Sequence, residues 1–294
     1  MGFKLLIILE KFLMFLPSNL RKAFFTFLGT IAYYLSSRYK KIAHQNLEFA
    51  FDNRLSEEEK KEITKYAFIN LLLNFLHVME IRHMSKEDLA QKVSIENIQA
   101  VQKVHKQGRA VIYATTHYSS WELGGAAISA FIEPIVAVYK KMKNEVYEDW
   151  LLESRDKFGN ISLEKTNVVR PLVKHLKQGM GCGLLIDTNI NEKDGVMVTF
   201  MGKNIRQTST PAYLARKFDA AIIPVTIRTD DDDNYILMLF DEIVVPHTDD
   251  IEDDIQKATQ AQADWLTSVI TQEPKFWFWL HRRWKNDHPE IYKN

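Results

Sequence analysis

The sequence predicts an α/β fold in which helices flank a mainly parallel central sheet. Short runs rich in β-forming residues alternate with segments of helical periodicity through most of the chain, the pattern of parallel strand–helix units. The 294 residues are 46% hydrophobic, without repeats or long linkers, which is enough for one large core. We therefore expect an apolar helical segment over residues 1–37 and one globular domain over residues 38–294.

The overall composition excludes several classes of protein. Lys plus Arg equals Asp plus Glu at 38 each, which argues against a dedicated nucleic-acid binder. The one cysteine, Cys182, cannot form an intrachain disulfide, and its apolar neighbours predict a small buried core residue. No His-Glu-x-x-His or Cys-x-x-Cys motif occurs, so we expect no metal site.

The N-terminal segment consists of two apolar runs, residues 3–16 and 23–35, separated by Pro17. Each run is shorter than the ~20 residues that a spanning helix needs, and signal-peptide features are not evident. Three arrangements remain open: a helical pair packed on the domain, a pair lying in the membrane interface, or a single tilted span. Because so few positions are polar, we favour membrane attachment.

Two helices are expected next. Residues 38–47 form a basic helix start, and Ser56 with Glu59 has the pattern of a capping box that opens an amphipathic helix reaching about Ile81. The apolar residues of this helix that we expect to face the core are Ile63, Phe68, Leu71, Leu72 and Phe75. His77 and His83 are interpreted as core or surface residues of the helix rather than ligands.

The stretch around residues 110–125 is the main candidate for chemistry. Residues 110–115 predict a buried parallel strand, and a helix is expected over 121–132 with Ser119 or Ser120 as its cap. His117 therefore lies at the carboxyl end of a central strand, where open α/β sheets bind ligands.

His117 and Glu122 have the residue types of a general base and its orienting acid. A carboxylate in the first turn of a helix is stabilised by the helix dipole and can hold a neighbouring imidazole in one tautomer. The same spacing also occurs by chance, and a histidine at a strand end is often an ordinary loop residue. The position between strand and helix favours the catalytic interpretation.

The alternation of strands and helices continues to the C-terminus. The expected strands are 133–138, 183–187, 220–227 and 235–240, with a hydrophobic stretch at 196–201; the expected helices are 144–158, 172–177, 211–218 and 249–271. The acidic run 229–234 reads as a hairpin turn rather than a cation site. Residues 276–285 end the pattern with an aromatic and basic run.

Several segments in this order resemble the late acyltransferases of bacterial lipid A biosynthesis, within the wider lysophospholipid acyltransferase superfamily. They are Lys-Ile-Ala-His-Gln-Asn-Leu-Glu at 41–48, His117-x4-Glu122, Asp-Trp-Leu at 149–151 with Arg155, Asp187, and Trp-Leu-His-Arg-Arg-Trp-Lys at 279–285. The resemblance runs from about residue 5 to residue 286. The sequence departs from the family at Glu10, Lys11 and Pro17, which interrupt a region where members often carry one clear span, and in the less charged stretch 187–191.

The resemblance implies transfer of a fatty acyl group from acyl carrier protein to a hydroxyl of a lipid A precursor. It places the enzyme at the cytoplasmic face of the inner membrane and requires no bound cofactor. His117 would remove the hydroxyl proton, Glu122 would orient His117, and Arg155 would complete the catalytic set. Backbone N–H groups near Ser119 and Ser120 would stabilise the oxyanion.

Further charged residues are candidates for binding. Arg155 and Arg170 suit lipid phosphates or the donor, because a guanidinium binds phosphate through two hydrogen bonds. Asp187 is a candidate for the substrate site. Basic residues available to acyl carrier protein, the membrane or the substrate phosphates are Lys140, Lys141, Lys143, Arg282, Arg283 and Lys285. Any of these could instead form a surface salt bridge.

Other functions remain open at this stage. The same chemistry could serve a glycerophospholipid or glycolipid acceptor, and coenzyme A could replace the carrier protein as donor. A non-enzymatic, membrane-peripheral scaffold is an alternative of a different class. A serine hydrolase is disfavoured because no Gly-x-Ser-x-Gly motif occurs.

Overall fold

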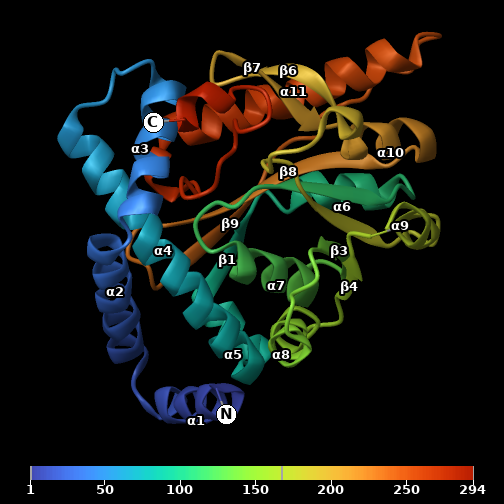
Figure 1. Cartoon of the computed structure of the whole chain (residues 1–294). Helices are drawn as coiled ribbons and strands as arrows, with labels where there is room; N and C mark the ends of the chain where they lie inside the picture. The colour runs from blue at the N-terminus through green and yellow to red at the C-terminus, as the bar shows by residue number, and fades with distance from the viewer. Residues whose placement is uncertain (1, 167, 294) are drawn as a thin grey trace.

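A computed structural model describes residues 2–166 and 168–293 of the chain (Figure 1). Its central sheet has seven strands in the order β1-β9-β8-β2-β5-β3-β4. The strands of this sheet are β1 (Val93–Glu96), β2 (Val111–Thr115), β3 (Ile135–Tyr139), β4 (Ile161–Glu164), β5 (Gly181–Leu185), β8 (Ala221–Thr229) and β9 (Tyr235–Leu239). All neighbours are parallel except the hairpin pair β8–β9, which confirms the predicted mainly parallel sheet.

The register of the central strands determines where the site forms. Thr115 of β2 lies opposite Leu185 of β5, so the two strands end level with each other. The loops that begin at Thr116 and Ile186 therefore leave the sheet side by side. Because parallel strands have their carboxyl ends at one edge, polar residues after β2 and β5 meet there.

Helices cover both faces of the sheet (Figure 1). They are α1 (Gly2–Phe15), α2 (Ser18–Leu35), α3 (Ser37–Phe51), α4 (Glu57–His83), α5 (Lys86–Lys92), α6 (Gln99–Lys106), α7 (Trp121–Phe131), α8 (Glu145–Arg155), α9 (Val169–Leu176), α10 (Thr210–Phe218) and α11 (Ile251–Gln272). Side chains of α6 and α7 pack on one face, and those of α3, α9, α10 and α11 pack in the cluster on the other. The long helix α4 contributes to both clusters, and its predicted Ser56 capping box is confirmed.

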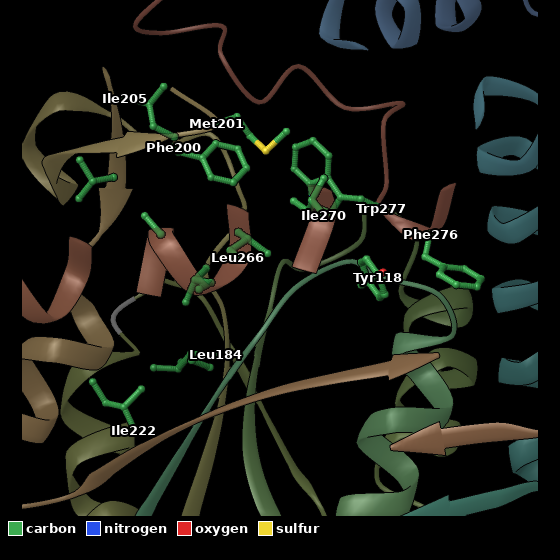
Figure 2. Close-up of a cluster of buried hydrophobic side chains, with 14 of the residues drawn as sticks. Tyr118, Leu184, Phe200, Met201, Ile205, Ile222, Leu266, Ile270, Phe276 and Trp277 are labelled. Carbon is green, nitrogen blue, oxygen red and sulfur yellow. The ribbon is translucent and has the colours of Figure 1, made fainter. Parts of the chain in front are cut away.

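The larger core cluster lies on the face of the sheet covered by α3, α9, α10 and α11, and it reaches the loop after β2. Figure 2 shows Tyr118 close to Phe276 and Trp277, with Phe200, Leu266 and Ile270 filling the space above the sheet. Cys182 is fully buried in this cluster, as predicted. The C-terminal aromatic run thus lies inside the molecule and reaches the loop that follows β2.

Four strands, β1, β4, β6 (Gly195–Phe200) and β7 (Lys203–Thr208), were not predicted as such. Edge strands β1 and β4 are only four residues long and half polar, so their sequence signal is weak. The hydrophobic stretch at 196–201 belongs to a hairpin, β6 with β7, outside the main sheet. The prediction that Leu71 and Phe75 face the core is wrong, because their side chains lie on the outer surface of α4.

The two N-terminal helices pack on the body of the molecule. Helix α2 runs along α4, while α1 crosses the end of the molecule beside α8 (Figure 1). Leu13 of α1 and Phe25 of α2 are buried in a third apolar cluster together with Trp150 of α8. Among residues 2–166 and 168–293, no helix combines the length and apolar character needed to cross a bilayer.

Candidate active site

His117 lies in the tight loop between β2 and α7, at the carboxyl edge of the sheet. Its side chain is about one quarter exposed (24%), whereas Ser119 and Ser120 behind it are buried. Ser119 adopts a left-handed backbone conformation (φ 46°), which is uncommon for a residue with a side chain and reverses the chain direction before α7 begins. The loop therefore presents one imidazole at the surface of a rigid turn.

Asp187 holds His117 in a single orientation. Its Oδ1 accepts a hydrogen bond from Nδ1 of His117 at 2.9 Å, and its Oδ2 accepts one from the backbone N–H of His117 at 2.8 Å. Oδ2 also accepts hydrogen bonds from Thr116 Oγ1 (2.7 Å) and Trp277 Nε1 (3.0 Å). With its Nδ1 occupied by the carboxylate, the ring presents Nε2 outward as a proton acceptor.

Electrostatics support an ionised Asp187 beside His117. Burial alone would raise the pKa of Asp187, but the charge and hydrogen bond of His117 hold it well below its ordinary value. Burial alone would lower the pKa of His117, and the charge and hydrogen bond of Asp187 outweigh this and raise it. The carboxylate thus increases the basicity of the imidazole, as in a histidine–aspartate pair of an acyl-transfer enzyme.

The expectation that Glu122 orients His117 by a hydrogen bond is wrong in this geometry. Glu122 forms a bidentate ion pair with Arg155, with Nη2–Oε1 at 2.6 Å and Nε–Oε2 at 3.1 Å, and it also accepts a hydrogen bond from Trp121 Nε1. Asp187 occupies the orienting position because the parallel register of β2 and β5 brings it beside the histidine. Asp187, which was expected in the substrate site, is fully buried.

The Glu122–Arg155 pair remains close to the histidine. Burial alone would raise the pKa of Glu122, but the Arg155 charge and hydrogen bonds lower it, so the carboxylate is ionised. Its charge adds to that of Asp187 in raising the pKa of His117, while Arg155 acts in the opposite direction. The structure thus brings together three predicted residues, His117, Glu122 and Arg155. Glu122 affects the pKa of His117 through its charge and not through a hydrogen bond.

The C-terminal segment 276–278 holds the loop between β2 and α7 in place through backbone hydrogen bonds. Phe278 donates its backbone N–H to the carbonyl of His117 (3.0 Å), and Ser119 donates its N–H to the carbonyl of Phe276 (2.9 Å). The Phe278 ring lies 6.0 Å from the His117 ring, centroid to centroid, and packs on His281 as well. Because its N–H is occupied, Ser119 itself is not available as an oxyanion donor, whereas the first N–H groups of α7 have no acceptor within their own helix.

Helix α4 supports the same loop with polar side chains. Asn70 and Asn74 both donate side-chain N–H groups to the carbonyl of Ser119, at 3.0 and 2.8 Å. His77 lies 2.6 Å from the Ser120 hydroxyl through Nδ1. Burial lowers the pKa of His77 well below its ordinary value, so it is a neutral structural partner, in line with the sequence interpretation of this residue.

An apolar cavity opens beside the histidine. It has a volume of about 970 Å³ including its open mouth, and it lies between α7 and the sheet. Trp121, Glu122 and Arg155 line it at the carboxyl edge, and the Trp121 ring contacts the His117 ring at 5.3 Å between centroids. Tyr113, Ile135 and Gly183 line its inner part, where Tyr113 donates a hydrogen bond to Glu133 (2.8 Å). The lining of the cavity is therefore mainly apolar, with a few polar groups at its carboxyl-edge end.

The remaining candidate residues lie in different places. Lys140 is exposed in the loop after β3, at the same edge of the sheet as His117, and Arg170 is exposed in the first turn of α9. Arg282 stacks over the ring of Tyr292. The expectation of a surface contact by Arg283 is wrong, because this side chain is only 1% exposed and packs over Phe200. Burial lowers the pKa of Arg283 to about 10.

Sequence reasoning missed the role of Trp277 and of the polar residues of α4. Trp277 was part of a noted aromatic run, but nothing in its neighbourhood indicates a hydrogen bond to a carboxylate 90 residues earlier. A signal did exist for Asp187, since it is the last residue of a predicted strand and His117 lies just after another. Adjacent parallel strands would bring the two side chains together, but the strand order was unknown.

A histidine paired with a buried carboxylate beside an apolar cavity, at the carboxyl edge of an α/β sheet, is an arrangement typical of enzymes that transfer acyl groups. The sequence profile described as "Bacterial lipid A biosynthesis acyltransferase" matches residues 1–286. The chain therefore belongs to the bacterial lipid A biosynthesis acyltransferase family.

Individual relatives are distant but cover most of the chain. This chain is 25% identical over 264 residues to the lipid A biosynthesis lauroyltransferase of Escherichia coli, and the match covers 88% of this chain and 83% of the relative. The palmitoleoyltransferase of the same pathway in that organism is 24% identical with the same coverage. A phosphatidylinositol mannoside acyltransferase of Mycolicibacterium smegmatis is 26% identical over 203 residues, covering 68% of this chain and 64% of the relative.

Proposed function

We propose that this protein transfers a fatty acyl chain from the thioester of acyl carrier protein to a hydroxyl of a lipid A precursor at a membrane surface. The observation that carries the proposal is His117, which is fixed through Nδ1 by the buried Asp187 and stands beside an open apolar cavity. An alcohol is a weak nucleophile at neutral pH, and a positioned base contributes about 10²–10⁴ in rate.

The reaction proceeds by direct attack. Nε2 of His117 removes the proton as the hydroxyl oxygen attacks the thioester carbonyl carbon, and N–H groups at the start of α7 stabilise the resulting oxyanion. The tetrahedral intermediate collapses, the carbon–sulfur bond breaks, and the imidazolium returns the proton to the thiolate of the donor. The products are an ester and a free thiol, and no bound cofactor takes part. Asp187 stabilises the imidazolium throughout.

The apolar cavity is proposed to hold the acyl chain. Its walls are aliphatic side chains of β3, β5, β8 and β9, the side chains of Tyr113 and Thr115 on β2, and small residues of α7 that include Gly124 and Gly125. Tyr113 is the innermost of the β2 residues that line it, and its hydrogen bond to Glu133 fixes the phenol ring there. Tyr113 is therefore proposed to limit the length of the chain that fits.

Charged groups around the mouth suit the other parts of the substrates. Arg155 is held by Glu122 through Nε and Nη2, so Nη1 remains for a phosphate or carbonyl oxygen. Arg170, exposed in the first turn of α9, is a second candidate for lipid phosphate. Exposed Lys140, Lys141 and Lys143 lie at the same edge and offer a basic patch to the acidic carrier protein. The site faces the cytoplasm in this proposal, where the carrier protein resides.

The decisive experiment compares His117→Ala with His247→Ala, an exposed histidine outside the site. Purified protein is given acyl carrier protein loaded with fatty acid and a lipid A precursor, and the product lipid is measured by mass spectrometry. His117→Ala should lower turnover by about 10²–10⁴ while the protein remains folded, as circular dichroism can check. Unchanged turnover would remove His117 from the reaction. His247→Ala should behave as the wild type.

A second acceptor class is a glycolipid other than lipid A. The similarity to a phosphatidylinositol mannoside acyltransferase favours this candidate, since the same residues could act on another sugar hydroxyl. Offering both lipid classes with both carrier-protein and coenzyme A donors decides between them, because only the true pair should give an acylated product at a substantial rate.

A further inference from the structure

We propose that three polar residues of α4, Asn70, Asn74 and His77, hold the first turn of α7 uncapped and oriented, so that its backbone N–H groups bind the oxyanion formed from an acyl thioester. They are positioning residues, because they contact the turn and not the substrate. The inference rests on the proposed function, since it names the residues that prepare the oxyanion-binding groups of that reaction.

The start of α7 differs from other helix starts in this chain. Ser56 and Ser85 stand before α4 and α5, and each forms a capping box in which its side chain accepts a hydrogen bond from the backbone of the third helical residue. Ser120 holds the same position before α7, but its side chain makes no capping hydrogen bond. Serine is among the best capping residues, and a missing cap destabilises a helix. The uncapped start of α7 therefore needs a physical reason.

His77 gives that reason. Its Nδ1 lies 2.6 Å from Ser120 Oγ, so the hydroxyl is engaged by α4 and not by α7. On the other side of the ring, Nε2 lies 3.4 Å from the hydroxyl of Tyr235 on β9, and the two rings pack edge to face at 5.2 Å. The N–H groups of Glu122 and Leu123, which a capping Ser120 would bind, thus keep no side-chain cap.

Asn70 and Asn74 determine the direction of the turn. Both donate side-chain N–H groups to the carbonyl of Ser119, at 3.0 and 2.8 Å. Because the C=O and the following N–H of a trans peptide point in opposite directions, the N–H of Ser120 points away from α4. Ser119 also has a φ of 46°, a strained conformation that persists only where its surroundings hold it. The two asparagines supply that hold.

The three residues form one polar stripe on α4. Positions 70, 74 and 77 are spaced by about one helical turn and share a face, and all three side chains are buried. Burying a polar side chain costs free energy, and its hydrogen bonds only offset that cost. Packing between a helix and a loop could be achieved with apolar side chains and no such cost. The stripe therefore points to the orientation of backbone groups as its purpose.

The turn held in this way faces the same cavity as the catalytic loop. Trp121 and Glu122 of the first turn of α7 line the cavity, as does Thr116 just before His117. The positive end of the α7 dipole lies at this turn. A thioester carbonyl at the cavity mouth can thus have its oxygen at these N–H groups and its carbon near His117. Donors fixed before the reaction stabilise developing negative charge most effectively.

The test begins with His77→Phe, which keeps a ring but removes Nδ1 and frees Ser120 to cap α7. With the acyl carrier protein donor, kcat should fall by about 10–10³ while KM changes little, because the lost interaction belongs to the transition state. His77→Asn has a terminal amide atom as many bonds from the backbone as Nδ1, so it should retain most of kcat. The control is Thr64→Val, which removes a buried hydroxyl of α4 that has no hydrogen-bond partner among the described residues, and it should behave as the wild type.

A second substitution separates capping from disturbed packing. His77→Phe/Ser120→Ala has no hydroxyl left to cap α7, so its kcat should be at least about tenfold higher than that of His77→Phe. A crystal structure of His77→Phe should show Ser120 Oγ within hydrogen-bond distance of the N–H of Glu122 or Leu123. Unchanged kcat in His77→Phe, no recovery in the double variant, or a start of α7 that stays uncapped in that crystal structure would each overturn the proposal.

Asn74→Leu provides a measurement that does not depend on the folding of the His77 variants. It removes one of the two donors to the Ser119 carbonyl, and kcat should fall by at least about tenfold with KM retained. An unchanged kcat would contradict the role of the stripe. If the wild type transfers no acyl chain to any lipid offered, the proposed function fails instead. The capping state of Ser120 in crystals of the wild type and of His77→Phe still decides the role of His77 in that case.

Discussion

At the scale of single residues, the site depends on a carboxylate buried at the end of a neighbouring strand. Asp187 accepts four hydrogen bonds, two of them from His117, and is completely buried. A buried carboxylate with this many donors remains ionised, and its charge keeps the imidazole basic and in one tautomer. Removing that charge should therefore affect both the rate and its dependence on pH.

Asp187→Asn should reduce kcat by about 10²–10⁴, because the amide neither stabilises the imidazolium nor fixes the tautomer. The sign of the pH effect follows from the raised pKa of His117. The base works only when deprotonated, so wild-type activity rises through that raised pKa. Without the Asp187 charge, the pKa of His117 falls and the acidic limb of the kcat/KM profile should move to lower pH. A lower rate with an unmoved limb would contradict the electrostatic role.

Tyr113→Ala should shift acyl-chain preference toward longer chains, because it removes a ring from the inner part of the cavity. The substitution should also lower the free energy of unfolding by about 3–5 kcal/mol, the usual cost for a large aromatic residue. Tyr113→Phe keeps the volume and loses only the hydrogen bond to Glu133, so it should retain the wild-type preference. Competition between donors of different chain length, read by mass spectrometry, checks both outcomes.

At the scale of elements, the attachment of α1 depends on one buried carboxylate. Burial alone would raise the pKa of Glu10, but hydrogen bonds from Trp150, Arg82 and His83 lower it below the ordinary value of 4.5. Because the pKa of Glu10 is lower in the folded protein than in the unfolded chain, its carboxylate stabilises the fold fully at pH values above its ordinary pKa. This stabilisation is lost as the pH falls through the pKa that Glu10 has in the folded protein.

Glu10→Gln should loosen α1, since it removes the charge that faces Arg82. Hydrogen exchange of residues 3–13 should become faster, with a loss of about 1–3 kcal/mol in local stability. The matched control is Glu153→Gln, which removes the other carboxylate partner of Arg82. That side chain is 66% exposed, so the effect should stay within about 1 kcal/mol. Acidification of the wild type should reproduce the loosening, and an equal effect of both variants would contradict the role of burial.

At the scale of the whole molecule, the two edges of the sheet differ in the residues that they carry. Loops at the carboxyl edge carry His117, Asp187 and the exposed Lys140, whereas the amino edge carries the end of α6. A carrier protein that delivers its thioester to His117 must approach the carboxyl edge. Electrostatic contacts there should affect the encounter rate more than the chemical step.

The triple variant Lys140→Glu/Lys141→Glu/Lys143→Glu should lower kcat/KM for an acyl carrier protein donor by about tenfold or more at low salt. High salt should reduce the difference, and kcat should change little. Lys103→Glu/Lys106→Glu at the amino edge serves as the control and should have no effect. If the triple variant retains full kcat/KM, the carrier protein binds elsewhere.

Much of the fold follows from local pattern. Four predicted features depend only on residues within a few positions of each other. They are the β2 strand, the Ser56 capping box, the β8–β9 hairpin and the buried Cys182. The wrong placement of Leu71 and Phe75 has a cause that lies beyond the local pattern. Leu71 and Phe75 have an apolar pattern that indicates a buried face, but whether that face meets protein depends on which helix packs there.

The sequence by itself determined the alternating strands and helices, the place of His117 at the end of a buried strand, and the family. Only the tertiary structure decided that Asp187, 70 residues away, orients the imidazole while Glu122 binds Arg155. Periodicity and capping reflect short-range geometry along the chain. The choice of partner for a side chain depends on strand order and register, which are settled when the whole core packs.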